Sequence, residues 1–152
     1  MRVPTKVMRL VAALGLVLAG VFTLPQPASA AAGDCARGNL CFWVDSGYSG
    51  PRYNLGPGSR NANLQNNPCG GCRSGTNPGA NGTWNDMASS WYNRQSVPVC
   101  LYQNANYSGT AIKIGANGGL SYRASFNDRM SSVRPAIYRS GAGTVPPGYF
   151  CF

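Results

Sequence analysis

The chain has 152 residues and a formal net charge of +9, with 13 Lys and Arg against four acidic residues. It contains no His and no Glu, so the side chains that most often act as general acid or base are missing, which argues against an enzyme. The length predicts a single domain.

The first 30 residues have the pattern of a secretory signal peptide. A basic start is followed by an uncharged apolar run at 10–24 and by small residues at 28–30, as at a cleavage site. The run is shorter than the ~20 apolar residues of a membrane anchor. We therefore expect residues 31–152 to be secreted into the extracellular medium, with no membrane partner.

The secreted part keeps ten basic residues and all four acids, and its net charge of +6 is spread along the chain. A dispersed positive charge favours solubility, with a weak attraction for anionic polymers. Export argues against a nucleic-acid partner, so we expect none.

All six Cys lie in the secreted part. An even count in a small exported chain indicates disulfides, and six Cys allow 15 pairings. A zinc site at Cys69 and Cys72 would lack His and a second C-x-x-C, and a redox role would lack a βαβ context. Sequence proximity and the position of the last Cys lead to one hypothesis, with bridges Cys35–Cys41, Cys69–Cys72 and Cys100–Cys151.

The chain after the leader is predicted to form short strands separated by turns. Apolar, aromatic and β-branched residues gather in short runs, with Gly, Asn and Ser between them. No stretch has the periodicity of a long amphipathic helix, so an all-β sandwich is predicted. The expected strands are 39–44, 52–55, 97–102 and 110–114.

Residues 56–83 are predicted to form a long loop. Pro57, Pro68 and Pro78 punctuate the segment, and Gly and Asn fill most of the rest. Loops of this length are usually functional or disordered. Two Cys within it favour a loop stapled by a disulfide.

A six-residue pattern, Asn-Asp-x-x-Ser-Ser, occurs at 85–90 and again at 127–132, each time directly after an aromatic residue, Trp84 or Phe126. Such short polar side chains bond to nearby backbone, so a single copy is adequately explained as a polar turn. Two copies in the same register indicate a duplicated structural unit instead. Their clustered hard oxygens suit Ca²⁺, which takes six to eight oxygen ligands.

The two halves of the chain also align outside this pattern. A Tyr-x-Gly turn stands at 48–50 and again at 107–109. From this Tyr to the Asn of the next repeat is 37 residues in the first half and 20 in the second, so the first half carries a 17-residue insertion. The insertion lies within 56–83 and contains Cys69 and Cys72.

An aromatic followed by Tyr-x-Gly and then Asn-Asp-x-x-Ser-Ser resembles one Greek-key unit of the βγ-crystallin fold. Two such units, at about 40–93 and 99–138, would form a disulfide-stapled sandwich. This resemblance implies a βγ-crystallin-like domain at 31–138, after the leader at 1–30 and before a C-terminal tail at 139–152.

Microbial members of the βγ-crystallin family bind calcium in a paired arrangement, and each site takes oxygens from both motifs. The resemblance therefore implies two Ca²⁺ sites. With one carboxylate per motif, we expect weak binding, on the order of 10⁻⁵ to 10⁻³ M. The implied ligands are the side chains of Asp86, Ser89, Asp128 and Ser131 and the backbone carbonyls of Met87 and Arg129, with Asn85 and Asn127 bracing the loops.

The full set of motifs resembles a more specific family. A secretory leader, Cys-x5-Cys-Phe-Trp and Cys-Leu-Tyr, together with the repeated motifs, resembles the secreted bacterial peptidase inhibitors directed at metalloproteinases. This resemblance implies a monomeric, non-enzymatic inhibitor whose partner is a secreted metalloproteinase.

The candidate inhibitory loop comprises Pro68, Cys69, Gly70, Gly71, Cys72 and Arg73. A stapled loop is preorganised, which lowers the entropic cost of binding. The alternative for the loop is a surface insertion stabilised by its disulfide. The alternatives for the whole chain are a calcium-stabilised extracellular structural or cell-wall module, or a secreted antimicrobial or toxin-like protein.

Overall fold

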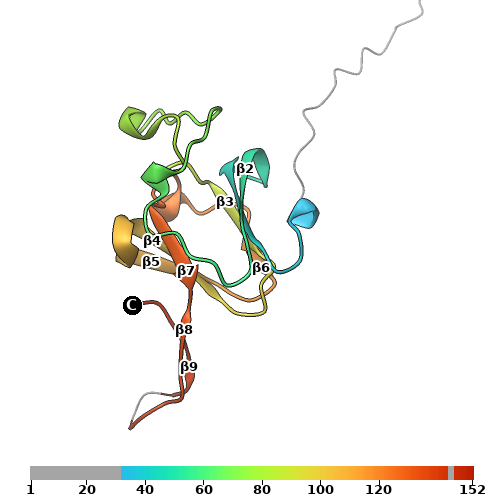
Figure 1. Cartoon of the computed structure of the whole chain (residues 1–152), viewed down its shortest axis with the longest axis vertical. Helices are drawn as coiled ribbons and strands as arrows, with labels where there is room; N and C mark the ends of the chain where they lie inside the picture. Colours follow the sequence, from blue (N-terminus) through green and yellow to red (C-terminus); the bar gives the residue numbers. More distant parts are fainter. Residues whose placement is uncertain (1–31, 144–145) are drawn as a thin grey trace, which may run out of the picture.

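The computed structural model describes residues 32–143 and 146–152, so the predicted signal peptide lies outside the described residues. Within the described part, no helix has the length and apolar character needed to cross a membrane. The fold there is built from nine short strands and five single turns of 3-10 helix (Figure 1). The strands are β1 (Leu40–Asp45), β2 (Ser49–Leu55), β3 (Ser90–Asn93), β4 (Val99–Asn104), β5 (Ser108–Ile114), β6 (Gly118–Leu120), β7 (Ser132–Pro135), β8 (Ile137–Arg139) and β9 (Gly148–Phe150). The 3-10 turns are η1 (Ala32–Asp34), η2 (Leu64–Asn66), η3 (Pro78–Ala80), η4 (Ala105–Tyr107) and η5 (Ala124–Phe126).

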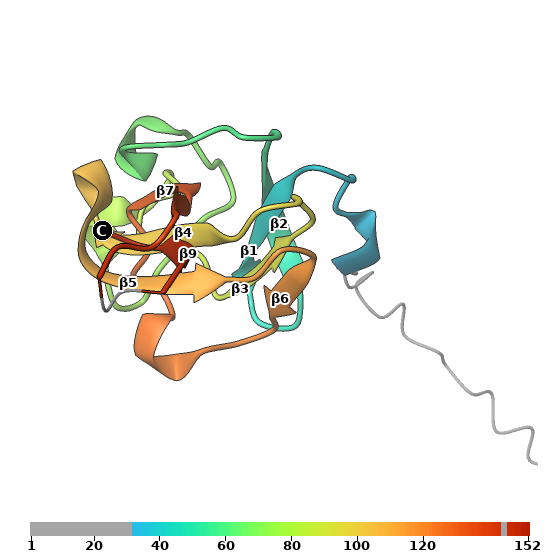
Figure 2. The same cartoon turned by 90° about the horizontal axis from the view of Figure 1, so that it is seen from below.

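Two antiparallel sheets face each other and form the body of the molecule (Figure 2). One has the strand order β2-β1-β3-β6 and the other the order β5-β4-β7. The all-β sandwich predicted from the sequence is confirmed. The four expected strands correspond to β1, β2, β4 and β5.

The two halves of the chain exchange segments between the sheets. β6 comes from the second half but pairs with β3 of the first. In return, Asn61 of the first half pairs with Val133 on β7, through two backbone hydrogen bonds of 2.8 and 2.9 Å. Because each half lends a segment to the other sheet, neither half is a self-contained layer.

The aromatic residue before each repeated motif anchors that motif in the core. Trp84 and Phe126 are both buried. Trp84 packs edge-on against Phe42 at 5.3 Å between ring centroids, and Phe126 packs against Trp91 at 6.0 Å. Burying an aromatic side chain of this size contributes about 2–3 kcal/mol, so each motif is held at a fixed depth between the sheets.

The three disulfides are Cys35–Cys41, Cys69–Cys72 and Cys100–Cys151, which confirms the hypothesised pairing. The first covers the outer face of β1 beside Trp43, and the last covers the outer face of β4 beside Tyr102. These covers explain why β1 and β4 have continuous buried runs instead of the alternation expected of half-exposed strands.

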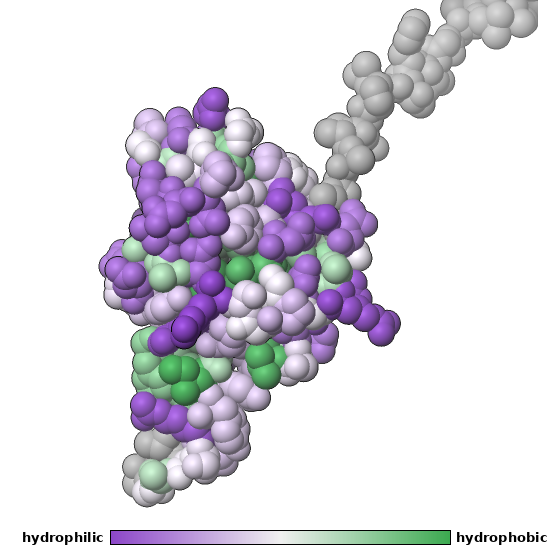
Figure 3. Space-filling view, in the orientation of Figure 1, coloured by the Kyte–Doolittle hydropathy of each residue, from purple (hydrophilic) through white to green (hydrophobic). Residues whose placement is uncertain are grey.

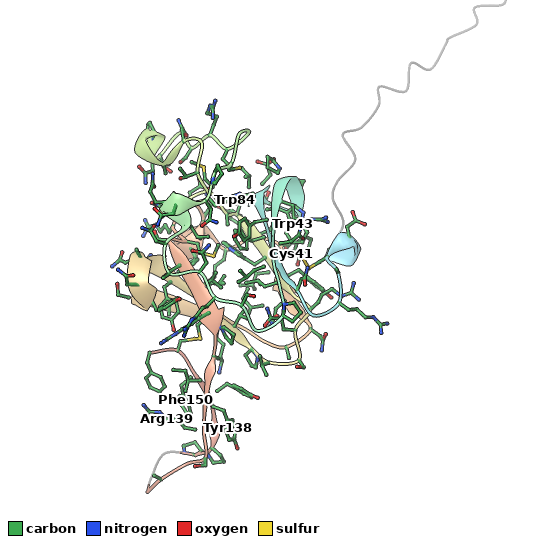
Figure 4. All side chains as sticks on the ribbon, in the orientation of Figure 1. Cys41, Trp43, Trp84, Tyr138, Arg139 and Phe150 are labelled. Atoms are coloured by element: carbon green, nitrogen blue, oxygen red, sulfur yellow. A yellow bond between two sulfur atoms is a disulfide. The ribbon has the colours of Figure 1, made fainter. Side chains whose placement is uncertain are left out.

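The segment predicted as a C-terminal tail folds back on the chain. β9 pairs with β8 in a two-stranded hairpin that projects from one end of the body (Figure 1). Figure 4 labels Tyr138, Arg139 and Phe150 on this hairpin, whereas Trp43 and Trp84 lie inside the body. Hydrophobic residues, drawn in green, gather on the surface near the same end in Figure 3, and Ile137 of β8 is 43% exposed.

Candidate functional site

The two repeated motifs meet across an approximate two-fold relation. Asp86 and Asp128 both have left-handed backbone conformations, with φ of 52° and 51°, which Asp tolerates better than most residues. The N–H of Asp86 donates to the carbonyl of Met130 at 3.0 Å, and the N–H of Asp128 donates to the carbonyl of Ala88 at 3.2 Å. Each Asp is therefore held by the backbone of the other motif.

The side chains of the motifs are paired crosswise. The Ser89 hydroxyl donates to Asp128 Oδ1 at 3.4 Å, and the Ser131 hydroxyl donates to Asp86 Oδ1 at 3.2 Å. Two oxygen clusters result, each with a carboxylate from one motif and a hydroxyl from the other. The structure thus brings together four of the sequence-predicted site residues as two separate pairs.

The other two predicted metal ligands are Met87 and Arg129, each of which directly follows the Asp of its motif. The Met87 side chain is fully buried in the core, and the Arg129 side chain is exposed. Neither side chain carries an oxygen, so each of these residues could contribute only its backbone carbonyl. The predicted roles of Met87 and Arg129 as carbonyl ligands stay predictions.

The second serine of each motif has a role that sequence reasoning missed. Ser90 is fully buried; its Oγ accepts the N–H of Tyr48 at 3.0 Å and donates to the carbonyl of Asp45 at 2.7 Å. Ser132 makes the equivalent bonds, to Tyr107 N–H at 3.0 Å and to a carbonyl of β4 at 2.6 Å. The separation between the Tyr of the turn and this serine is 42 residues in the first half and 25 in the second, so the sequence showed no fixed spacing that would reveal the link.

The turns that these serines hold require glycine at the third position of Tyr-x-Gly. Gly109 has φ of 75°, and a Cβ there would lie 2.7 Å from the Asn104 amide nitrogen. Gly50 has φ of 74° in the equivalent turn. Glycine, which has no Cβ, adopts such a conformation without strain.

The Asp86 carboxylate is held by two side-chain amides. Asn85 Nδ2 donates to Asp86 Oδ2 at 2.9 Å. Asn77 Nδ2 donates to the same oxygen at 2.7 Å. Asn77 belongs to the long loop, 56–83, and no sequence signal marked it as a site residue.

The Asp128 carboxyl sits in a less favourable environment for its charge. Burial raises its pKa above the ordinary value of 3.8, and the negative charges of Asp86 and Asp45 raise it further. Hydrogen bonds from Ser89 and Asn127 lower the pKa and offset part of this effect. A bound cation would relieve the same penalty, because it favours the ionised form.

The donor set at the motifs is made of hard oxygens. Among residues 32–143 and 146–152, no three or more His, Cys, Asp or Glu side chains lie close enough together to hold a metal. Any cation at the motifs would therefore use single carboxylates together with hydroxyl and carbonyl oxygens. This chemistry fits Ca²⁺ better than a transition metal.

The candidate inhibitory loop is a tight turn with its sulfurs inward. The N–H of Cys72 donates to the carbonyl of Cys69 at 3.1 Å, and both side chains belong to the main core. Pro68, Gly70, Gly71 and Arg73 are exposed around them. The buried disulfide thus holds an exposed tip.

Backbone ladders hold both sides of this turn. The N–H of Cys69 donates to the carbonyl of Gly82 at 2.7 Å, and Gly82 N–H donates to the carbonyl of Cys72 at 3.1 Å. Pro68 pairs with Thr83. The long loop was expected to lack secondary structure, but it contains η2, η3 and this ladder because its Cys, Pro and Asn residues supply local partners.

The arrangement of the two sheets is that of the βγ-crystallin fold. A solved structure from work on the evolution of the eye-lens βγ-crystallin domain fold matches with a TM-score of 0.52 at 15% identity, covering 68% of this chain and 90% of that one. A βγ-crystallin domain from Flavobacterium johnsoniae has a TM-score of 0.45 and 26% sequence identity, and the match covers 63% of this chain and 91% of that one. A βγ-crystallin domain from Clostridium beijerinckii has a TM-score of 0.45 and 24% sequence identity, and the match covers 64% of this chain and 95% of that one.

The sequence model of peptidase inhibitor family I36 matches residues 28–114, more than half of the chain. The chain belongs to this family of peptidase inhibitors, and it is not an enzyme. No curated protein sequence matches the chain.

Proposed function

We propose that the protein is secreted and inhibits a metalloproteinase of the thermolysin type as a monomer, by presenting residues 68–73 to the active-site cleft. The observation that carries this proposal is the construction of the loop. Within a family of peptidase inhibitors, this exposed tip is fixed by a buried disulfide below it and by backbone hydrogen bonds on both sides.

The construction suits a protease cleft for two physical reasons. A loop already fixed in shape loses little conformational entropy on binding. Gly70 and Gly71 carry no side chain, so a partner can approach their backbone closely. The segments on both sides of the turn are held by backbone hydrogen bonds. If the protease cleaved a peptide bond within the turn, the two new chain ends would therefore stay in place.

The test is a bulky substitution at the tip with a matched control in the same loop. A Cβ at Gly70 or at Gly75 meets no atom within 4 Å, so Gly70→Trp and Gly75→Trp should both fold with a melting temperature near that of the parent. We expect Gly70→Trp to weaken inhibition of thermolysin about tenfold or more, because the indole blocks contact at the centre of the interface. Gly75→Trp should inhibit like the parent.

Two outcomes would contradict this proposal in different ways. If Gly70→Trp inhibits as well as the parent, the inhibitory contact lies elsewhere, for example on the β8–β9 hairpin at the other end of the molecule (Figure 1). If the parent inhibits no enzyme in a broad panel of secreted metalloproteinases, a calcium-stabilised extracellular module becomes the better description.

We also propose that the motifs form two weak Ca²⁺ sites. One would use Asp86 and Ser131 and the other Asp128 and Ser89, which are the pairs already in contact. The backbone carbonyls of Met87 and Arg129 would add ligands, and water would complete the shell. A bound Ca²⁺ supplies positive charge between the motifs, and binding only to the folded form stabilises it by mass action.

Titration calorimetry tests the calcium proposal. We expect two sites with dissociation constants of about 10⁻⁵ to 10⁻³ M and a higher melting temperature at millimolar calcium. Asp128→Ala should remove the site that includes Ser89. If the parent shows neither heat of binding nor a change in melting temperature, the proposal is refuted.

A further inference from the structure

We propose that Asn77 is a positioning residue that couples the Asp86 calcium site to the inhibitory loop, so that calcium binding orders the loop. This inference rests on the proposed calcium binding and on the assignment of residues 68–73 as the docking segment. It adds a regulatory link between two features that the motifs and the disulfide do not connect by themselves.

The two carboxylates differ in a way that the repeat does not explain. Asp128 accepts hydrogen bonds from Ser89 and from its own neighbour, Asn127. Asp86 has the equivalent bonds, from Ser131 and Asn85, and in addition the 2.7 Å bond from Asn77. This third donor comes from the long loop, which has no counterpart in the second half of the chain.

The contact fixes which oxygen of Asp86 is available to a cation. Asn77 and Asn85 both donate to Oδ2, while Oδ1 faces the Ser131 hydroxyl. The carboxylate is therefore oriented with Oδ1 toward the oxygen cluster. Outer hydrogen bonds of this kind orient ligating carboxylates, and their loss typically lowers metal affinity 10–100-fold.

A short run of hydrogen bonds leads from Asn77 to the docking turn. The N–H of Asn77 donates to the Ser74 hydroxyl at 3.0 Å. Ser74 is buried, and its own N–H donates to Asn81 Oδ1 at 2.6 Å. Ser74 directly follows Arg73 of the candidate inhibitory loop. Asp86 is thus linked to the loop through groups that are already in contact.

Thermodynamic linkage makes this coupling reciprocal. If the ordered loop helps Asp86 to bind calcium, calcium must favour the ordered loop by the same free energy. Because the second site has no such donor, only the Asp86 site should show the effect. The disulfide and the ladder already restrict the loop, and calcium would improve inhibition by further reducing the conformational entropy that the loop still loses on docking.

The test compares Asn77→Ala with Asn66→Ala. Asn66 lies in η2 of the same loop and is exposed, so its substitution is a matched control. Calcium affinity is measured by calorimetry, and amide hydrogen exchange of residues 70–82 is measured with and without calcium. In the parent and in Asn66→Ala, calcium should slow exchange in this segment. In Asn77→Ala, one site should weaken about tenfold, the other should not change, and exchange in the segment should no longer respond to calcium.

The possible failures are distinguishable. A parent that binds no calcium overturns both the calcium proposal and the coupling. A parent that binds calcium but whose loop exchange does not respond overturns the coupling alone, without relying on any variant. Two parent-like affinities and a parent-like exchange response in Asn77→Ala would also overturn the coupling. Because these readouts are independent of inhibition, they hold whichever peptidase is the target.

Discussion

The two serines of each motif should respond differently to substitution by alanine, because they face different partners. In Ser90→Ala, the Tyr48 N–H and the Asp45 carbonyl both lose their hydrogen bond to a fully buried hydroxyl. An unsatisfied group costs roughly 1–3 kcal/mol, and water can reach part of this turn because Asp45 is exposed. We therefore expect a loss of about 2–3 kcal/mol, a large share of the 5–15 kcal/mol stability of an ordinary domain.

In Ser89→Ala, the change in a calcium-free buffer should be smaller. Ser89 makes one side-chain hydrogen bond, to Asp128, at the long distance of 3.4 Å, so its loss should cost less than about 1 kcal/mol. In a buffer with calcium, the two variants should differ in how much calcium stabilises them. Ser89→Ala should lose part of the stabilisation by calcium, whereas Ser90→Ala should keep it.

Urea unfolding followed by tryptophan fluorescence, in EDTA and again in millimolar calcium, measures both effects. Ser132→Ala and Ser131→Ala provide the same comparison in the second half of the chain. Equal losses for Ser89→Ala and Ser90→Ala in EDTA would refute the division of roles. A calcium response that is lost in Ser90→Ala but kept in Ser89→Ala would refute the ligand assignment.

Two further predictions concern the disulfides and pH. The Cys100–Cys151 bridge spans 51 residues, so replacing both Cys by Ala should cost about 4 kcal/mol, against about 2 kcal/mol for the short Cys69–Cys72 bridge; equal losses in urea unfolding would contradict this. Since folding raises the pKa of Asp128, its contribution favours the fold below pH 3.8 and is lost as pH rises through the raised pKa. Calcium needs the ionised carboxylate, so the increase in melting temperature produced by calcium should shrink as pH falls through that pKa. An increase that does not change with pH would contradict the placement of Asp128 in a site.

Local chemistry made much of this protein predictable from its sequence. Tyr-x-Gly marks a turn whose glycine needs positive φ, and Gly109 adopts it. The repetition of Asn-Asp-x-x-Ser-Ser indicated a duplicated structural unit, and its resemblance to the βγ-crystallin pattern implied two Greek-key units. Sequence proximity favoured the bridges at Cys35–Cys41 and Cys69–Cys72, which need only a short closed loop.

Contacts between distant segments were decided by the tertiary structure. The pairing of Ser89 with Asp128 joins residues 39 positions apart, and its crosswise form follows from the way that two halves pack against each other. The exchange of β6 for the segment at Asn61 has the same origin. The local hydrogen bonds within a motif can be predicted from its sequence, but they do not determine which distant carboxylate the motif will contact.

Asn77 is the clearest case of what the sequence could not determine. It is one of many Asn residues in a long loop, and Asn side chains bond to local backbone as readily as to a distant carboxylate. Only the burial of the Cys69–Cys72 sulfurs in the core, and the ladder that follows from it, folds the loop back so that the Asn77 amide meets Asp86. The motifs are set by short-range backbone preferences, whereas their link to the loop depends on packing across the whole domain.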